Sequence, residues 1–294
     1  MPAEKIKLLT LILSYDEGHH KEIQTKGQDA TFITEAIQAS KVFRYVGRSF
    51  KLPTKYKVIF VIRRWQYALL DYSKYPFIGF LLRLFVNSRF ADQATRSIPK
   101  FSGASSNKEC IEVKNVNEPV PKLITESPED WSLIGLKTIL AFKYLLDNYE
   151  FDYLFRTNTS SYLDVPNLLD YLEKKPRKNI YAGVIGTTFG KTRFASGAGI
   201  LLSRDIVQRI SDNSDLWKHG LVDDVAIADL VATFQDPSVN VSELPRLDFA
   251  SLEEAKSTDA EIIRENFHFR CKTSSAAETI GIMKHIYAVK NSGS

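Results

Sequence analysis

Short apolar runs alternate with stretches of helical periodicity along this chain, and this alternation constrains its fold more than any other feature. The runs have the length of buried strands, and they lie at residues 6–14, 57–62, 110–113, 153–156, 180–185, 199–202 and 267–271. Helices are expected at residues 29–46 and 131–149, and after the capping residues Asp164, Ser203, Asp223 and Ser275. Strands that alternate with helices predict an α/β fold, with a mostly parallel central sheet flanked by helices on both faces.

The composition is that of a globular protein and excludes several classes. The 294 residues are 44% hydrophobic and 25% charged, so one large domain can bury a substantial core. The net charge of +4 suits an anionic substrate or an acidic membrane surface, but it falls short of the clustered basic residues of a nucleic-acid-binding protein. Cys110 and Cys271 are far apart in the sequence, which favours buried free thiols in a reducing compartment over a disulfide.

Two apolar segments bear on membrane contact. The run from Leu8 to Leu13 is shorter than a membrane span and has no small-residue cleavage site after it, so we interpret it as a buried strand. The segment 75–90 is interrupted by Arg83 and is also too short to span. A core or interdomain helix is favoured there, and a membrane-surface helix is the alternative. We expect a cytoplasmic protein, with peripheral contact at the inner membrane face as the alternative.

Three polar or small-residue segments are candidates for the site, because ligands of such sheets bind where loops leave the carboxyl ends of strands. The loop RTNTSS spans residues 156–161 and follows an expected strand. The segment ASGAGILLS spans residues 195–203 and is rich in small side chains. The segment VDDVAIADL spans residues 222–230 and places two carboxylates at the start of a helix.

Together these segments carry a resemblance to a known family. The run ESPEDWSLIGLKTILAFKYLLDNYEFDYLFRTNTSSYLDVPNLLDYL, residues 126–172, resembles the central block of the β-1,3-galactosyltransferase and fringe family of glycosyltransferases. The segments YAGVIG (181–186), FASGAGILLSRDIV (194–207) and VDDVAI (222–227) follow in the family's order. The similarity covers roughly residues 120–235, whereas the N-terminal third matches only as a generic nucleotide-binding half, without the family's arginine motif.

The resemblance implies a single GT-A-like domain over residues 1–294, with a nucleotide-binding half at 1–125 and an acceptor and catalytic half at 126–294. It also implies an inverting, β-1,3-like hexosyltransferase of polysaccharide biosynthesis. Such an enzyme moves a sugar from a nucleotide-diphosphate sugar, often a UDP-sugar, to a hydroxyl of a glycan or lipid-linked acceptor.

One departure from the family concerns its metal. Where the family usually carries three aspartates for a divalent ion, this chain has Asn158, Thr159 and Ser160. Hard cations such as Mg²⁺ and Mn²⁺ favour carboxylate oxygens, so neither is expected as a cofactor, and weak binding through Asn158, Ser160 and His268 is the alternative. We expect the loop, with Arg156, to contact the donor; a simple capped turn is the other interpretation.

Without a metal, basic side chains must neutralise the leaving diphosphate. His268, Arg270 and Lys272 alternate in sequence, so on a strand they share one face. Arginine and lysine are common phosphate ligands, and in the resembled family a C-terminal histidine can ligate the metal. We expect these three residues to bind the donor; an ordinary half-exposed strand is the alternative.

The acidic pair is the expected catalytic centre. An inverting transferase needs a carboxylate that takes the proton from the acceptor hydroxyl. Asp224 matches the central aspartate of the family's acidic motif and is assigned as the general base, while Asp223 is expected to cap the helix or orient the acceptor. Two acids at a helix start are also explained by capping and the helix dipole, which is the alternative.

The remaining candidates extend the site on both sides. Tyr15 and Asp16 follow the first strand, where the base and ribose of a nucleotide would dock; an ordinary polar turn is the alternative. Ser196 and Gly197 would let the acceptor approach the backbone closely, but strands of such small residues also arise from tight helix packing. Trp131 and Trp217 would contact or stack against the acceptor. Competing functions are a non-catalytic sugar- or nucleotide-binding module on the same fold, and a nucleotidyltransferase. The second would normally call for metal-binding carboxylates and a glycine-rich phosphate loop, and neither is evident.

Overall fold

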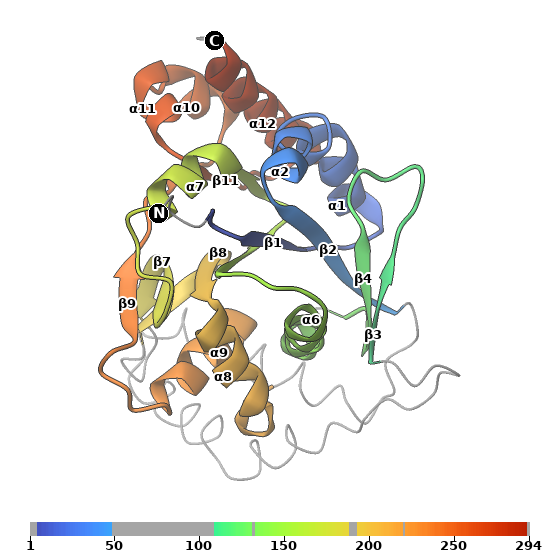
Figure 1. Cartoon of the computed structure of the whole chain (residues 1–294). Helices are drawn as coiled ribbons and strands as arrows, with labels where there is room; N and C mark the ends of the chain where they lie inside the picture. Colours follow the sequence, from blue (N-terminus) through green and yellow to red (C-terminus); the bar gives the residue numbers. More distant parts are fainter. Residues whose placement is uncertain (1–4, 49–108, 131–132, 188–192, 220, 293–294) are drawn as a thin grey trace, which may run out of the picture.

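The computed structural model describes residues 5–48, 109–130, 133–187, 193–219 and 221–292. Within them, one large sheet has the strand order β3-β4-β2-β1-β5-β8-β7-β9 (Figure 1). Its strands are β1 (Leu8–Leu13), β2 (Lys41–Arg48), β3 (Cys110–Val113), β4 (Lys122–Pro128), β5 (Tyr153–Asn158), β7 (Ile180–Thr187), β8 (Arg193–Ser203) and β9 (Asn240–Glu243). In this described part of the sheet only β3 and β8 run against the others. The predicted α/β fold with a mostly parallel sheet is confirmed.

Helices cover both faces of this sheet (Figure 1). Helices α6 (Ile134–Asn148), α8 (Arg204–Asp212) and α9 (Asp223–Ala232) lie on one face, and α2 (Ile33–Ala39) and α7 (Val165–Leu172) lie on the other. The side chains of β1 alternate between the two faces. Leu8 and Ile12 join the core under α2 and α7, whereas Leu9, Leu11 and Leu13 join the core under α6, α8 and α9. A strand that is buried on both sides explains the continuous apolar run.

A second, smaller sheet brings the C-terminal part of the chain to the end of β5. It has the order β10 (Leu247–Phe249), β11 (His268–Cys271) and β6 (Ser161–Leu163). Strands β6 and β11 are antiparallel, with Arg270 opposite Ser161, and the backbone N–H of Cys271 donates to the carbonyl of Ser160 at 2.7 Å. The loop after β5 and the segment after β11 are therefore neighbours, although more than 100 residues separate them.

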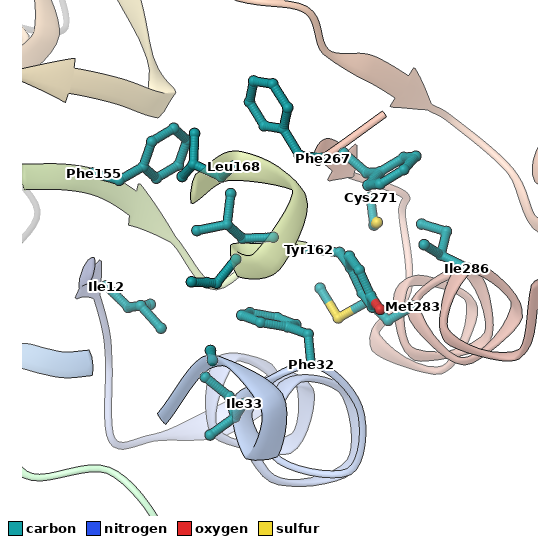
Figure 2. Packing of buried hydrophobic residues seen from close by; sticks show 14 of the residues in the cluster. Ile12, Phe32, Ile33, Phe155, Tyr162, Leu168, Phe267, Cys271, Met283 and Ile286 are labelled. Carbon is teal, nitrogen blue, oxygen red and sulfur yellow. The ribbon is translucent and has the colours of Figure 1, made fainter. Parts of the chain in front are cut away.

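The C-terminal helices α10 (Leu252–Ser257), α11 (Ala260–Glu265) and α12 (Ala276–Asn291) close the α2 side of the molecule (Figure 1). Figure 2 shows how Met283 and Ile286 of α12 pack beside Cys271 and Tyr162, with Phe32 below them. This cluster ties the small sheet to the N-terminal segment after β1. That segment consists of α1 (Gly18–Glu22) and a π-helix, η1 (Ile23–Gln28), while a short 3₁₀ turn, η5 (Ser214–Leu216), precedes α9.

The elements differ from the sequence-based expectations in two respects. Of the helix expected at residues 29–46, only Ile33–Ala39 is α-helical, and Lys41–Arg48 forms the central strand β2. Strands β4, β6, β9 and β10 were not among the expected strands. The expected strand at 57–62 and the apolar segment at 75–90 lie outside the described residues.

The capping residues were predicted with mixed success. Asp164 accepts from the N–H of Asn167 at 3.1 Å, and Ser275 accepts from the N–H of Glu278 at 3.1 Å, as capping requires. Ser203 occupies the N-cap of α8, but its hydroxyl accepts from the N–H of Ile180 instead. The prediction that Asp223 caps α9 is wrong, because the helix begins at Asp223 and Val222 is the N-cap.

Two further expectations concern compartment. Cys110 and Cys271 are both buried and unpaired, as predicted. Among the helices of the described ranges, none has both the length and the apolar character needed to cross a bilayer.

We predict that Gly199→Ala destabilises the protein by about 1–3 kcal/mol, because a Cβ at this position would lie 2.0 Å from the His268 ring. Gly281→Ala on α12 is the matched control. Its Cβ would meet only the flexible end of Leu252 at 3.2 Å, and alanine favours the helix. Urea unfolding of both variants checks the prediction, and equal stabilities would contradict the packing of His268 against β8.

Candidate active site

A cavity of about 500 Å³ opens at the carboxyl ends of β1 and β5. Six of the residues predicted to bind a donor line it, and they come from three separate segments of the chain: Tyr15, Asn158, Thr159, Ser160, Arg270 and Lys272. The paired ends of β1 and β5, where Leu13 lies opposite Asn158, bring the first two segments together. The antiparallel pairing of β6 with β11 adds the third. These residues, which are far apart in the sequence, therefore lie around one cavity.

The polar loop after β5 is held by hydrogen bonds within the loop and from Gln28. The side-chain oxygen of Asn158 accepts from the N–H of Ser160 at 3.0 Å and from the hydroxyls of Ser160 and Ser161 at 2.8 and 3.3 Å. The amide group of Gln28 donates to three carbonyls of the loop, those of Asn158, Thr159 and Ser161, at 3.1–3.3 Å. The hydrogen bonds expected of a polar turn are therefore present, and the same loop lines the cavity, while its contact with a donor stays a prediction.

The same contacts test the alternative metal site. The Asn158 oxygen that would bind a cation already accepts three hydrogen bonds within its own loop. The ring of His268 is fully buried and does not line the cavity, and its Nε2 lies 3.1 Å from the carbonyl oxygen of Ala198. Among the described residues, no cluster of three or more histidine, cysteine or acidic side chains could hold a metal ion. The residues of the weak metal site do not fit a divalent cation.

His268 is also wrongly placed among the donor-binding residues. Burial lowers the pKa of His268 to about 3, so its ring is neutral and supplies no positive charge to a phosphate. The alternation along β11 does place it on the face of Arg270, but two residues deeper, against Phe155 and Gly199. Only Arg270 and Lys272 of the expected trio reach the cavity.

These two cations differ in how they are held. A guanidinium nitrogen of Arg270 lies 3.7 Å from the carboxylate of Asp248, which orients the side chain. Lys272 is exposed, and in the described part of the chain it has no ion-pair partner. The cavity therefore combines one oriented and one unpaired positive charge, an arrangement suited to a phosphate-bearing ligand.

The acidic pair lies at the amino end of α9, beside β8. Asp224 is partly buried, and its carboxylate accepts from the N–H of Gly197 and from the N–H of Val225, both at 2.9 Å. Burial and the negative charge of Asp223 raise the pKa of Asp224 to about 6. The carboxylate of Asp223 is buried and forms an ion pair with Arg156. The two aspartates thus have different environments: one is paired, and one is held only by backbone N–H groups.

Arg156 does not contact the cavity, so its assignment to donor binding is wrong. It is 1% exposed. Its guanidinium donates to the hydroxyl of Tyr45 at 3.0 Å, to the carbonyl of Gly197 at 2.6 Å and to Asp223. Its position on β5 directs the side chain under the sheet, toward α6 and α9, rather than into the loop that follows.

Gly197 connects the acidic pair to the cavity. Asp224 does not line the cavity, but the carbonyl of Gly197, whose N–H binds Asp224, lies 3.4 Å from the amide nitrogen of Asn158. A Cβ at Gly197 would lie 2.9 Å from Arg156 and 3.3 Å from Asp224. The missing side chain makes room for these two residues, which explains the glycine without an acceptor.

Other predicted residues are engaged elsewhere. The carboxylate of Asp16 pairs with Lys122 at 3.0 Å and does not line the cavity. The hydroxyl of Ser196 accepts from Arg246 at 3.1 Å. Trp217 is 1% exposed and its ring packs against Gly135, so the prediction that it offers a stacking surface is wrong. Trp131 lies outside the described residues.

Sequence reasoning missed several residues around the cavity. His19 and His20 line it, and the ring of His20 lies 5.1 Å from that of Tyr15 and within hydrogen-bond distance of the Thr159 hydroxyl, at 3.1 Å. The signal was available, because both histidines follow the first strand just as Tyr15 does. Lys137 is fully buried beneath Tyr15, 4.5 Å from its ring centre, and forms an ion pair with Glu129. No sequence signal distinguishes it from an exposed helical lysine.

Comparison with protein-family models finds no match for this chain, and comparison with curated proteins finds none.

The raised pKa of Asp224 has a stability consequence with a definite sign. In the unfolded chain the carboxyl loses its proton near its ordinary pKa of 3.8, but in the folded protein it does so only near 6. Between these values the folded state binds more protons, so stability falls as pH rises. We predict that Asp224→Asn removes this loss.

The free energy of unfolding of wild type minus that of Asp224→Asn should decrease by on the order of 2–3 kcal/mol between about pH 4 and pH 7. Urea unfolding of both proteins across that range measures it. A difference that does not change with pH would show that Asp224 titrates normally.

Proposed function

We propose that this chain is an inverting glycosyltransferase that uses a nucleotide-diphosphate sugar as donor and a hydroxyl of a glycan or glycolipid as acceptor. The observation that carries the proposal is the meeting of Tyr15, the loop 158–160, Arg270 and Lys272 around one cavity, with Asp224 one residue behind its wall. The ordered resemblance to the β-1,3-galactosyltransferase and fringe family supports the same reaction and a GT-A-like arrangement of the sheet.

The cavity suits the donor in size and in charge. Its volume of about 500 Å³ lies within the range of small-molecule sites, about 300–1,000 Å³. Arg270 and Lys272 line the cavity with positive charge that would neutralise a diphosphate, and the neighbouring rings of Tyr15 and His20 would contact a base. A UDP-sugar is the donor class that the resemblance favours.

In the proposed reaction the acceptor oxygen attacks the anomeric carbon of the bound sugar. Asp224 takes the proton of that hydroxyl as the new carbon–oxygen bond forms. The bond between the anomeric carbon and the phosphate oxygen breaks, and the nucleoside diphosphate leaves with the electron pair. A pKa of about 6 suits this role, because the carboxylate is mostly ionised near neutral pH and still a better base than an ordinary aspartate.

The proposal includes a nucleoside diphosphate that leaves without the help of a metal ion, and a cytoplasmic location for the protein. The engaged oxygen of Asn158 and the buried ring of His268 argue for Arg270 and Lys272 as the diphosphate ligands. Two buried, unpaired cysteines fit a reducing compartment.

We predict that Asp224→Asn lowers sugar transfer by at least about 100-fold, because the acceptor loses its base, while the donor Kd changes by less than about twofold. Asp229→Asn, the same substitution farther along α9, is the control and should retain transfer. Product formation with a panel of nucleotide sugars and glycan acceptors measures turnover, and calorimetry measures the donor Kd. Full turnover in Asp224→Asn would remove the assignment, and donor binding without transfer in the wild type would favour a non-catalytic binding module.

We predict that Arg270→Ala and Lys272→Ala each weaken the binding of a nucleoside diphosphate by roughly tenfold, because each removes one charged phosphate contact. Lys284→Ala, an exposed lysine of α12 outside the cavity, should bind as the wild type does. Thermal stabilisation by uridine diphosphate and UDP-sugars, with and without a chelator, measures the effect. Stabilisation that disappears with the chelator would show that a metal, rather than this pair, holds the diphosphate.

A further inference from the structure

Two charged residues that do not reach the cavity surround the proposed base. Arg156 of β5 and Asp223 of α9 form a buried ion pair, with side chains 2% and 7% exposed. Burying two charges is costly unless they are paired and hydrogen-bonded, and removing one partner leaves the other uncompensated. The guanidinium of Arg156 meets this requirement, since all three of its nitrogens have partners.

The ion pair reaches Asp224 through one residue of β8. The carbonyl of Gly197 accepts from Arg156 at 2.6 Å, and its N–H donates to Asp224 at 2.9 Å. Gly197 is thus held from both ends, and it has no space for a side chain on this side. A shift of Arg156 would move the peptide that orients the Asp224 carboxylate.

Few other charges face Asp224 within the described residues. Asp223 is its neighbour on α9, Arg156 faces it from β5, and Tyr181 lies within electrostatic range from β7. Burial raises the pKa of Tyr181, whose hydroxyl accepts from the N–H of Ala195, so this group stays neutral near pH 7. Tyr45 contacts Arg156 on its far side and is also neutral. The positive and negative charges of the ion pair are therefore the two that act on Asp224 in opposite directions.

We infer that Arg156 and Asp223 are positioning residues, which orient Asp224 through Gly197 and balance the charges around its carboxylate. This inference rests on the proposed function for its purpose, but its physical content is a property of the folded chain alone. It replaces donor binding as the role of Arg156, and helix capping as the role of Asp223.

Four variants separate this role from a merely structural one. In Asp223→Asn, a negative neighbour is lost, so Asp224 should titrate about one pH unit or more lower. In Arg156→Met, a positive neighbour is lost, so it should titrate about one pH unit or more higher. The double variant loses both charges and should return toward the wild type, and Arg156→Lys, which keeps the charge, should shift less than Arg156→Met.

The measurement is a carbon-13 NMR titration of the side-chain carboxyls in the full chain labelled at aspartate, with Asp224→Asn identifying the signal. It needs no substrate. If Arg156→Met does not fold, Arg156→Lys should still shift the titration upward by a smaller amount, and if Asp223→Asn does not fold, the double variant should still titrate lower than Arg156→Met. Opposite shifts in the two single variants support the inference, and shifts in one direction, or none, overturn it.

The acid limb of the kcat/KM profile of each active variant should move with the NMR titration. If the chain transfers sugar but the Asp224 titration does not shift in opposite directions, the inference is wrong and the proposed function is retained. If the titration shifts in opposite directions but the chain transfers no sugar, the proposed function is wrong and the electrostatic role of the ion pair is retained.

Discussion

The buried ion pair between Arg156 and Asp223 is the interaction on which the candidate site depends. It joins the centre of the sheet to the amino end of α9, and through Gly197 it joins both to β8. A buried pair of this kind is weak evidence for stability, because desolvation offsets much of its Coulomb energy. Its retention is better explained by the geometry it imposes, since it allows one arrangement of β5, β8 and α9 around Asp224.

The positions of the other residues around the cavity are set by the ends of β1 and β5 and by the small sheet beside them. Tyr15 and Asn158 leave adjacent parallel strands at the same edge, and the small sheet adds Arg270 and Lys272 to that edge. The buried side of the edge holds Arg156, which is paired with Asp223, and the open side holds Arg270, which lies 3.7 Å from Asp248, and Lys272, which has no ion-pair partner among the described residues. Arg270 and Lys272 line the cavity and Arg156 does not, so they are the two cations that an anion in the cavity would meet.

The sequence predicted the α/β fold, and the ends of the strands around which the candidate residues gather, because both depend on local patterns. The apolar run of β1, the cap at Asp164 and the polar residues after β5 have the same meaning in any parallel sheet. Strand β2 escaped prediction because it is buried on both faces and so lacks alternation, and Phe43 continues the helical spacing of the preceding segment. Its identity as a strand comes from pairing with β1, which is not a local signal.

The sequence does not distinguish the side chains that make internal contacts from those that line the cavity. Arginine, histidine and tryptophan are common in binding sites. In this chain, however, the side chains of Arg156, His268 and Trp217 each contact a residue of the protein that is far away in the sequence. Alternation places a residue on one face of a strand but not at a given depth, which is why His268 and Arg270 share a face and only Arg270 reaches the cavity. Depth is set by the register of β11 against β6, and register depends on tertiary packing.

Asp223 and Asp224 also differ because of contacts with residues that are distant in the sequence. Adjacent acids at a helix start are chemically equivalent in the sequence, and only the neighbours supplied by β5 and β8 distinguish them. Asp223 receives a full positive charge and is committed to structure. Asp224 receives only two backbone N–H groups and retains affinity for a proton. The fold thus pairs one of two identical side chains with Arg156 and leaves the other with a raised pKa, which suits Asp224 to the proposed role of base.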